Sequence, residues 1–353
     1  MRKPDFYSRA LSGGIAVACM TLAVATAQAG PNQLITFDVP GAGTASGQGT
    51  YPMSISGASL ITGKYVDSSN VSHGFIGTAT GTITTFDSPG AGTGSGEGTT
   101  ATAINKTGEV TGYYTTTKNH GFVRHSDGTF QFFDISLGTD TTPTAINSRG
   151  VVTGSGGGSG GFVRLANGSL IPFSVSGATT TSPHAINTTG TVAGSYYAGD
   201  NTQHGFFRTR DGTITTFDVP GGFASTYADG INNAGDITGY AVTGGITPAY
   251  VGFVRKASDG SISIFYNIAG CQVNYVFPSA INFDGTVVGT CLDENFVQRG
   301  FIRSPDGTVS SFSAPNSPGG TSPNAIAANG KTVGYANDVN FVAHGFRLNA
   351  GRK

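Results

Sequence analysis

Side chains able to do chemistry are sparse in this 353-residue sequence, in which 11% of residues are charged and 6 are histidine. We single out His184, Tyr227, Asp229, Tyr275 and Asn324 as candidate ligand-binding residues. The tyrosine rings can stack on the face of a sugar, and the imidazole, carboxylate and amide groups can hydrogen-bond its hydroxyls. This set predicts a binding or scaffold module for a glycan or for another protein.

A catalytic interpretation uses part of the same set. His184 or Tyr227 would remove the proton next to a uronate carboxylate, and Arg299 or Lys118 would neutralise that carboxylate. The chain would then be a lyase acting on a uronate polysaccharide. A hydrolase with two carboxylates is less favoured, because Asp229 is the only carboxylate among the candidates.

Other chemical motifs are missing from the sequence. It contains no Cys-x-x-Cys, no His-Glu-x-x-His and no other clustered metal-ligand spacing. Its glycine-rich runs, such as residues 94–98, do not lie between a strand and a helix, so they do not predict a phosphate cradle. We therefore expect no metal and no cofactor. The net charge of −1 provides no attraction for nucleic acid or for an anionic membrane.

The elements that must position the candidates repeat along the chain. A Gly-Phe pair recurs every 40 to 48 residues, with its phenylalanine at Phe75, Phe122, Phe162, Phe206, Phe253, Phe301 and Phe346. Each repeat also carries an Ala-Ile-Asn-like triplet, a Val-x-Gly-like triplet and an aromatic segment related to Thr-Phe-Asp. These segments are rich in Thr, Val, Ile and Phe and are separated by turn residues, so they predict four short antiparallel strands per repeat.

Four strands in about 45 residues are typical of a β-propeller blade. We predict an all-β fold, a seven-bladed β-propeller of four-stranded antiparallel blades, as a single domain over residues 30–353. The 56 glycines argue against a helical protein, and a parallel β-helix is the less favoured alternative. Residues 34–39 read as a lone outer strand, and the last repeat lacks one. We expect this N-terminal strand to complete the last blade and close the ring.

The candidates depart from the repeat. Two residues before the isoleucine of each Ala-Ile-Asn-like triplet, the sequence has Met53, Thr102, Thr144, His184, Asp229, Ser279 and Asn324. We expect these positions to ring the mouth of a central channel, with Tyr227 and Tyr275 just upstream. The long, variable loops are expected on the same face of the disc, where binding groups usually lie. The alternative is a rim of polar groups that is merely solvated.

The repeat resembles an extracellular family named for its His-Ala-Phe signature (HAF repeats), in which an Ile-Asn-x-x-Gly-x-Val-x-Gly run precedes that signature. The resemblance covers the chain after residue 29 and is closest at His73, His120, His204 and His344, each followed by Gly-Phe. Glycine replaces the central alanine, and the histidine is lost at Gly160, Val251 and Arg299. The resemblance implies a secreted, propeller-like protein with no general assigned activity, so it supplies no catalytic residue. We expect the four histidines to make structural hydrogen bonds.

Residues 1–29 have the pattern of a cleaved secretory signal peptide. Three basic residues precede an apolar run over residues 15–25, and a small-x-small site predicts cleavage after Ala29. The run is too short for a good membrane span. We therefore expect a secreted or periplasmic monomer whose partner is a polysaccharide or an extracellular protein. In that oxidising environment we expect Cys271 and Cys291 to be bridged, the alternative being two buried free thiols.

Overall fold

The protein is described here by a computed structural model covering residues 33–78, 81–200 and 202–349. These residues form twenty-eight β-strands, labelled β1 to β28, and contain no helix. The predicted signal peptide, residues 1–29, lies outside the described residues. The all-β prediction is confirmed.

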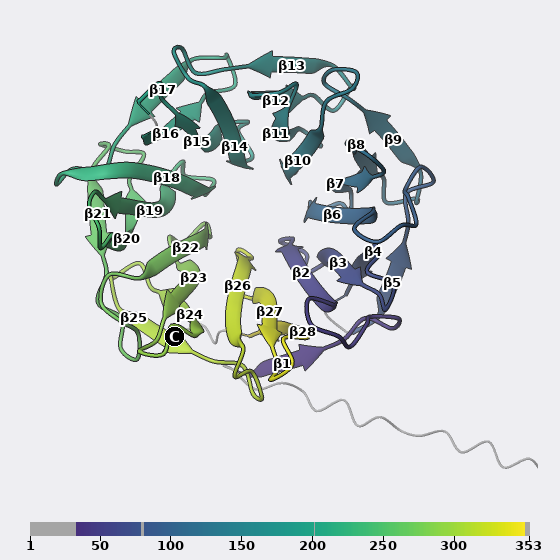
Figure 1. Cartoon of the computed structure of the whole chain (residues 1–353). Coiled ribbons are helices and arrows are strands. Elements are labelled where there is room, and N and C mark those ends of the chain that lie inside the picture. Colours follow the sequence, from purple (N-terminus) through teal and green to yellow (C-terminus); the bar gives the residue numbers. More distant parts are fainter. Residues whose placement is uncertain (1–32, 79–80, 201, 350–353) are drawn as a thin grey trace, which may run out of the picture.

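The strands form four-stranded antiparallel sets. Four sets are separate sheets, β10–β13, β14–β17, β18–β21 and β22–β25. The remaining strands belong to one mixed sheet, in which β2–β5, β6–β9 and β26–β28 with β1 are each antiparallel. Within this mixed sheet the sets are joined by two parallel bridges, Gly49 with Ala343 and Ser72 with Gly98. Figure 1 shows the sets arranged around a central axis, which is the architecture of a β-propeller.

We call each four-stranded set a blade and name it by its inner strand, the one nearest the axis in Figure 1. The inner strands are β2 (Gly49–Ile55), β6 (Gly98–Ile104), β10 (Thr141–Ile146), β14 (Thr180–Ile186), β18 (Phe223–Ile231), β22 (Val276–Ile281) and β26 (Gly320–Ile326). The second strands are β3 (Ile61–Val66), β7 (Val110–Thr115), β11 (Val152–Gly156), β15 (Val192–Tyr197), β19 (Ile237–Thr243), β23 (Val287–Leu292) and β27 (Thr332–Asn337).

The third and outer strands complete the blades. The third strands are β4 (Ser72–Gly77), β8 (Asn119–Arg124), β12 (Gly160–Arg164), β16 (Gln203–Arg208), β20 (Tyr250–Arg255), β24 (Gln298–Arg303) and β28 (Ala343–Leu348). The outer strands are β1 (Leu34–Phe37), β5 (Ile83–Phe86), β9 (Phe130–Phe133), β13 (Leu170–Phe173), β17 (Ile214–Phe217), β21 (Ile262–Phe265) and β25 (Val309–Phe312).

The Gly-Phe pair explains how neighbouring blades pack. Every phenylalanine of the pair is fully buried. Each also meets the outer-strand phenylalanine of the preceding blade edge to face, with ring centroids 5.8–6.4 Å apart. The glycine makes room for the outer strand of its own blade, because a Cβ at Gly205 would lie 2.6 Å from the ring of Phe217. This close packing is a physical reason for glycine where the HAF signature has alanine.

The asparagine of the Ala-Ile-Asn triplet ties adjacent blades together. The Oδ1 atom of Asn187 accepts hydrogen bonds from the backbone of its own turn, at Thr189 and Thr191. Its Nδ2 donates to the carbonyl of Asn232 in the next blade at 3.2 Å. Asn105, Asn147 and Asn232 make the equivalent bond to the blade that follows each of them. The repeated triplet is therefore structural.

The four histidines of the His-Gly-Phe sequences also have structural partners. Their Nδ1 atoms lie 2.8–3.0 Å from the aspartate that follows the outer strand of the same blade, in the pairs His73–Asp87, His120–Asp134, His204–Asp218 and His344–Asp38. Three of the imidazoles also stack on a tyrosine of the second strand. The expectation of structural hydrogen bonds is confirmed for these histidines.

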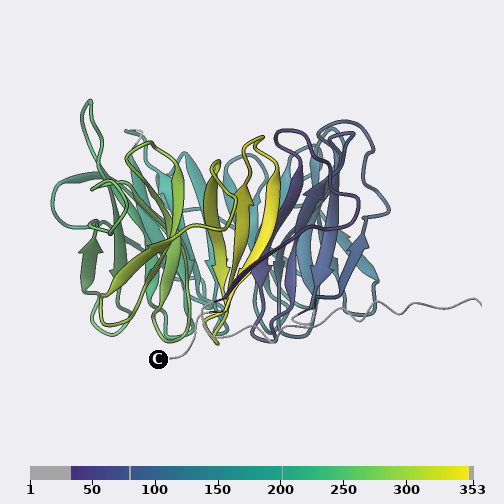
Figure 2. The same cartoon turned by 90° about the horizontal axis from the view of Figure 1, so that it is seen from below.

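The two faces of the disc differ. Turns between inner and second strands, and between third and outer strands, lie on what we call the turn face. Connections from second to third strands, and from outer strands to the next inner strands, lie on the loop face. The two kinds of loop contact each other, as in the 3.0 Å hydrogen bond from Gly47 N to Phe341 O. Figure 2 shows the two faces as the upper and lower edges of the molecule seen from the side.

Candidate functional site

The candidate positions around the axis all lie at β-bulges. In each inner strand the pairing with the second strand shifts register at the residue two before the isoleucine. A bulge removes a residue from the regular ladder and redirects its side chain. The bulged residues are Met53, Thr102, Thr144, His184, Asp229, Ser279 and Asn324.

Most bulged residues form a hydrogen bond to the next blade, a bond we call the bulge clasp. The side chain donates to the carbonyl of the residue just before the next bulge. Thr102 reaches Pro143 O at 3.0 Å and Ser279 reaches Pro323 O at 2.7 Å. His184 Nδ1 lies 3.0 Å from Ala228 O. These positions were expected to ring the mouth of the central channel. In the structure they lie at the bulges of the inner strands, and the side chains that form the clasp hold neighbouring blades together.

Asn324 is separated from the other candidates by its clasp. Its Nδ2 donates to Pro52 O at 2.8 Å, which joins the β26 blade to the β2 blade. The structure therefore gives Asn324 the same role as Thr102 and Ser279, and it does not bring Asn324 into contact with His184 or Asp229. The sequence could not reveal this role, because hydroxyl and amide side chains satisfy the same carbonyl.

His184 and Asp229 do meet. His184 Nδ1 lies 3.2 Å from Asp229 Oδ1, and the two side chains are 31% and 24% exposed. Burial alone would lower the pKa of His184, but the hydrogen bond and charge of Asp229, together with the Ala228 carbonyl, raise it above the ordinary imidazole value. The Oδ2 atom of Asp229 is buried and has no hydrogen-bond partner among the described residues. Two adjacent blades thus supply a His–Asp pair next to the axis.

Tyr227 and Tyr275 belong to a group of aromatic rings on the loop-face side of this His–Asp pair. Tyr227 stacks on Tyr240 with centroids 4.4 Å apart, and Tyr240 meets Phe277 at 5.4 Å. Tyr250 contacts Phe277 at 5.0 Å and Tyr275 at 5.9 Å, and Tyr275 meets Phe296 at 5.8 Å. We call Tyr227, Tyr240, Tyr250, Tyr275, Phe277 and Phe296 the aromatic cluster.

Two blades build the aromatic cluster. Tyr227, Tyr240 and Tyr250 come from β18, β19 and β20, whereas the other three rings come from the β22 blade and its loops. Burial raises the pKa values of Tyr227 and Tyr240, and the nearby Asp229 carboxylate adds to both increases. These phenols are therefore neutral groups that can stack and hydrogen-bond.

Phe296 is the most exposed ring of the cluster. Its side chain is 62% exposed and its backbone φ is 60°. This left-handed conformation is uncommon for a bulky residue and is found mainly where the surroundings impose it. In the β2 blade the equivalent position of the loop is Asn70, which tolerates the same conformation well. Phe296 therefore occupies a strained, solvent-facing position at the edge of the cluster.

The sequence did not identify Tyr240, Phe277 or Phe296. Tyr240 follows an Ile-x-Gly triplet, where tyrosine recurs in other repeats, so it looked structural. Phe277 lies at the start of an inner strand, where four other repeats have Thr or Ser and two have Tyr. The available signal was the pairing of Tyr227 with Tyr240 across the ladder, which requires the strand register.

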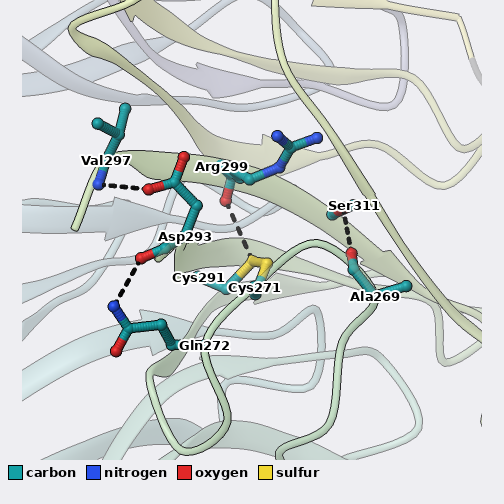
Figure 3. Close-up of a disulfide and its surroundings, with 8 residues drawn as sticks. All are labelled: Ala269, Cys271, Gln272, Cys291, Asp293, Val297, Arg299 and Ser311. Atoms are coloured by element: carbon teal, nitrogen blue, oxygen red, sulfur yellow. Dashed lines mark hydrogen bonds between the residues drawn. A yellow bond between two sulfur atoms is a disulfide. The ribbon is translucent and has the colours of Figure 1, made fainter. Parts of the chain in front are cut away.

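A disulfide fixes the loop that carries Tyr275. Cys271, in the loop before β22, is bonded to Cys291 of β23, which confirms the predicted bridge (Figure 3). Beside it, Gln272 N donates to Leu292 O at 2.7 Å and Gln272 Nε2 donates to Asp293 O at 2.9 Å. The loop is therefore held to its own blade by the bridge and by the residue that follows Cys271.

Arg299 and Lys118 lie away from His184 and Tyr227. Arg299, on β24, is opposite Cys291 in the ladder, and Figure 3 shows it beside the disulfide. Lys118 lies in the turn between β7 and β8, on another blade, and lines a shallow hollow with Asp140. The structure thus brings together His184 with Asp229 and Tyr227 with Tyr275, but it does not bring the predicted carboxylate-neutralising cations to them.

The described part of the chain offers neither a candidate metal site nor a candidate membrane-spanning helix. No cluster of three or more His, Cys, Asp or Glu side chains suited to a metal ion occurs in these residues. The same residues also include no helix with the length and apolar character needed to cross a membrane.

Comparison with known proteins identifies the fold. No protein-family model and no curated protein matches the sequence. A solved streptogramin B lyase is 15% identical with a TM-score of 0.58, covering 90% of this chain and 98% of its own. A catalytically inactive virginiamycin B lyase from Staphylococcus aureus, with quinupristin, is 15% identical with a TM-score of 0.56, covering 90% and 99%. The β-propeller domain of the Trilobed protease from Pyrococcus furiosus is 10% identical with a TM-score of 0.60, covering 90% and 97%. At these identities the likeness establishes a β-propeller fold alone.

Proposed function

We propose that the chain is an exported, seven-bladed β-propeller, closed by β1, that binds a glycan through the aromatic cluster. Export is supported by the predicted signal peptide and by the disulfide, because such bonds persist in oxidising environments. The repeat supports seven blades, since each Gly-Phe pair lies on the third strand of its own blade.

Closure is supported by three contacts of β1 that match those of other outer strands. β1 pairs antiparallel with β28 over four residues, from Leu34 with Leu348 to Phe37 with Gly345. Asp38 bonds to His344 as the other outer-strand aspartates bond to their histidines. Phe37 also meets Phe75 of the next blade edge to face at 6.4 Å. The first strand of the described chain thus behaves as the outer strand of the last blade.

Glycan binding is supported by one observation above all: six aromatic rings in continuous contact, beside the His184–Asp229 pair, whose polar groups can hydrogen-bond a ligand. Sugar rings present C–H groups on their faces and hydroxyls around their edges, so an aromatic face next to polar groups suits them. His184 lies on β14, and its partner Asp229 lies on β18, two residues after Tyr227. The disulfide holds the Tyr275 loop in place, which reduces the entropy lost on binding.

The second candidate is a lyase that acts on a uronate polysaccharide, and the observation that favours it is the His184–Asp229 pair. A carboxylate that orients an imidazole is a common arrangement for a general base. The raised pKa of Tyr227 disfavours a tyrosinate base, and Arg299 lies at the disulfide. Two of the similar structures are lyases by name, which is a likeness of fold.

A glycan array tests the binding proposal. We expect retention of at least one glycan by the purified protein and at least tenfold weaker binding by Tyr227→Ala or Tyr275→Ala. Phe132→Ala is the matched control, because Phe132 is an aromatic residue on the outer strand β9 with 46% of its surface exposed. Absence of retention, or equal loss in the control, would refute an aromatic-cluster site.

The same preparation distinguishes the lyase. Incubation with a panel of uronate polysaccharides would produce unsaturated products, detected by their ultraviolet absorbance. A rise that disappears in His184→Ala would replace the binding proposal with the catalytic one. We expect no such rise.

A further inference from the structure

The turn face carries a basic hollow between the β10 and β14 blades. Arg149, Arg208 and Arg210 supply its charged groups, and the rest of its lining is uncharged, including the apolar side chains Val151, Val163, Leu165 and Ile171. Arg149 comes from the turn between β10 and β11, Arg208 ends β16, and Arg210 lies in the turn that follows. The hollow is therefore assembled by two blades, on the opposite face from the aromatic cluster, and has no acidic residue in its lining.

Arg208 forms the base of this hollow and is buried, with 7% of its surface exposed. Its guanidinium lies 5.0 Å above the ring of Phe173 in the β10 blade, and its Nη1 donates to Thr209 O at 3.2 Å. Its Nε is buried without a hydrogen-bond partner among the described residues. Burial lowers its pKa, an effect that Asp211 partly opposes. The hollow thus contains a poorly solvated cation.

Arg149 and Arg210 form the rim. Both side chains are exposed, and neither makes a hydrogen bond or an ion pair with another described residue. The stem of Arg210 lies against the turn at Gly190, where an added Cβ would be 3.5 Å from the Arg210 Cβ. Packing on this turn holds Arg210 beside the opening rather than directed away from the disc.

The next hollow around the axis is an internal control. It lies between the β14 and β18 blades and is lined at the equivalent positions by Thr189, Arg255 and Ala257. The buried arginine is retained, since Arg255 stacks on Phe217 at 5.3 Å. The two rim arginines are replaced by Thr and Ala, so the packing between neighbouring blades does not require them. Two departures from the repeat therefore introduce positive charge into one hollow.

Acidic groups near the hollow already have partners. Asp211 accepts hydrogen bonds from the Thr209 hydroxyl and from the backbone N–H of Thr213. Glu109, on the far side of the Arg149 turn, binds Asn105 Nδ2 at 2.7 Å and His125 Nδ1 at 3.1 Å. The three guanidinium groups thus remain the dominant charge at the opening.

We propose that this hollow binds an oxyanion, namely a carboxylate, sulfate or phosphate group. Planar guanidinium groups match the oxygens of such anions and can bind them through paired N–H donors. Two of them, on exposed turns, can close on a ligand, and the third supplies a charge that water screens poorly. The ligand is either a free anion or the same group on an acidic oligosaccharide. This site is independent of glycan binding on the loop face.

The test uses the neighbouring hollow as its template. We would titrate the purified protein by calorimetry with sodium sulfate, sodium phosphate and a galacturonate oligomer, at constant ionic strength. Saturable binding is expected for at least one probe, at least tenfold weaker in Arg149→Thr with Arg210→Ala. Those replacements reproduce the composition of the β14–β18 hollow, so the variant is expected to fold.

Lys106→Thr is the control, because Lys106 is a basic residue in another turn of the same face. Binding that depends on the two arginines supports the site. If sulfate or phosphate binds, the ligand is a free anion; if only the galacturonate oligomer binds, the ligand is the carboxylate of an acidic oligosaccharide. No saturable binding of any probe by the parent protein refutes it, as does equal weakening in Lys106→Thr. Glycan-array retention by the double variant should match the parent, which separates this test from that of the aromatic cluster.

Discussion

The joint between β1 and the β2 blade lacks an interaction that other joints contain. In five blades an arginine at the end of the third strand lies 4.9–5.3 Å above a phenylalanine of the preceding blade, as Arg124 lies above Phe86. At the β1 joint the equivalent residue is Gly77, opposite Phe37. An apolar hollow of about 60 Å³ is found there, lined also by Ile61 and Arg347.

We predict that Gly77→Arg stabilises this joint. A Cβ at Gly77 would contact only the Cβ of Ile61, at 3.7 Å, which is an ordinary packing distance. Stacking on Phe37 should contribute about 0.5–1 kcal/mol. Burying two methylenes of the stem adds roughly 1.6 kcal/mol. Replacing glycine adds about 0.5–1 kcal/mol through the unfolded state. Immobilising the side chain costs roughly 2 kcal/mol. The net gain is about 1 kcal/mol.

The assay is thermal unfolding followed by circular dichroism. A gain of this size should raise the midpoint by about 2 °C for a domain of this length. Gly77→Leu is the matched control, because Leu348 occupies the equivalent position of the β26 blade and packs with Phe312. Leucine fills the hollow without adding charge beside Arg347. A lower unfolding midpoint in both variants than in the parent protein would refute the reasoning, because it would show that the hollow between β1 and the β2 blade cannot accept a larger side chain.

Three further predictions concern single residues. Asp229→Asn should lower the pKa of His184 below that of the parent protein in an NMR titration, because burial is then opposed by fewer groups; an unchanged pKa would contradict the pairing. Since that pKa is raised in the fold, the stabilising contribution of His184 should be complete below the ordinary value of about 6.5 and lost as pH rises through the raised value. Cys271→Ser with Cys291→Ser should cost about 3 kcal/mol in denaturant unfolding, from a crosslink spanning 20 residues, and should weaken glycan binding; unchanged stability would show that the bridge constrains nothing. Asn187→Ala removes the bond to the next blade and the acceptor of its own turn, so it should cost roughly 2 kcal/mol, whereas a cost below about 0.5 kcal/mol would argue against its buried role.

The fold could be predicted from the repeated residues, because a residue that recurs with a fixed spacing occupies the same structural environment in each blade. Phe206 and its counterparts marked every third strand, and Asn187 marked the turn after an inner strand. Gly205 departed from the HAF signature, yet its reason is visible only in three dimensions, where Phe217 takes the space of the missing methyl group. Strand order followed from the sequence, and the contacts between blades did not.

The candidate site was predicted only in part, because its residues lie on different strands and blades and are far apart in the sequence. Tyr227 and Tyr275 were identified because they lie beside long loops. Tyr240 is on a different strand and joins Tyr227 only through the strand register. Arg299 was chosen for its charge, but its position on β24 directs it to the disulfide. Residues brought together across two blades leave no local pattern in the sequence.

Variation at one repeat position is therefore an incomplete guide to function. The bulged residues include Thr102, His184, Ser279 and Asn324, which differ in chemistry and still make the same clasp to a carbonyl of the next blade. A clasp needs only a donor, so the residue type can change while the role is kept. Asp229, when ionised, cannot donate and is instead paired with His184 of the preceding blade. Met53 and Asp229 are the two bulged residues without the shared hydrogen bond, and only Asp229 of these two carries a polar side chain, which places Asp229, rather than Asn324, at the centre of any function near the axis.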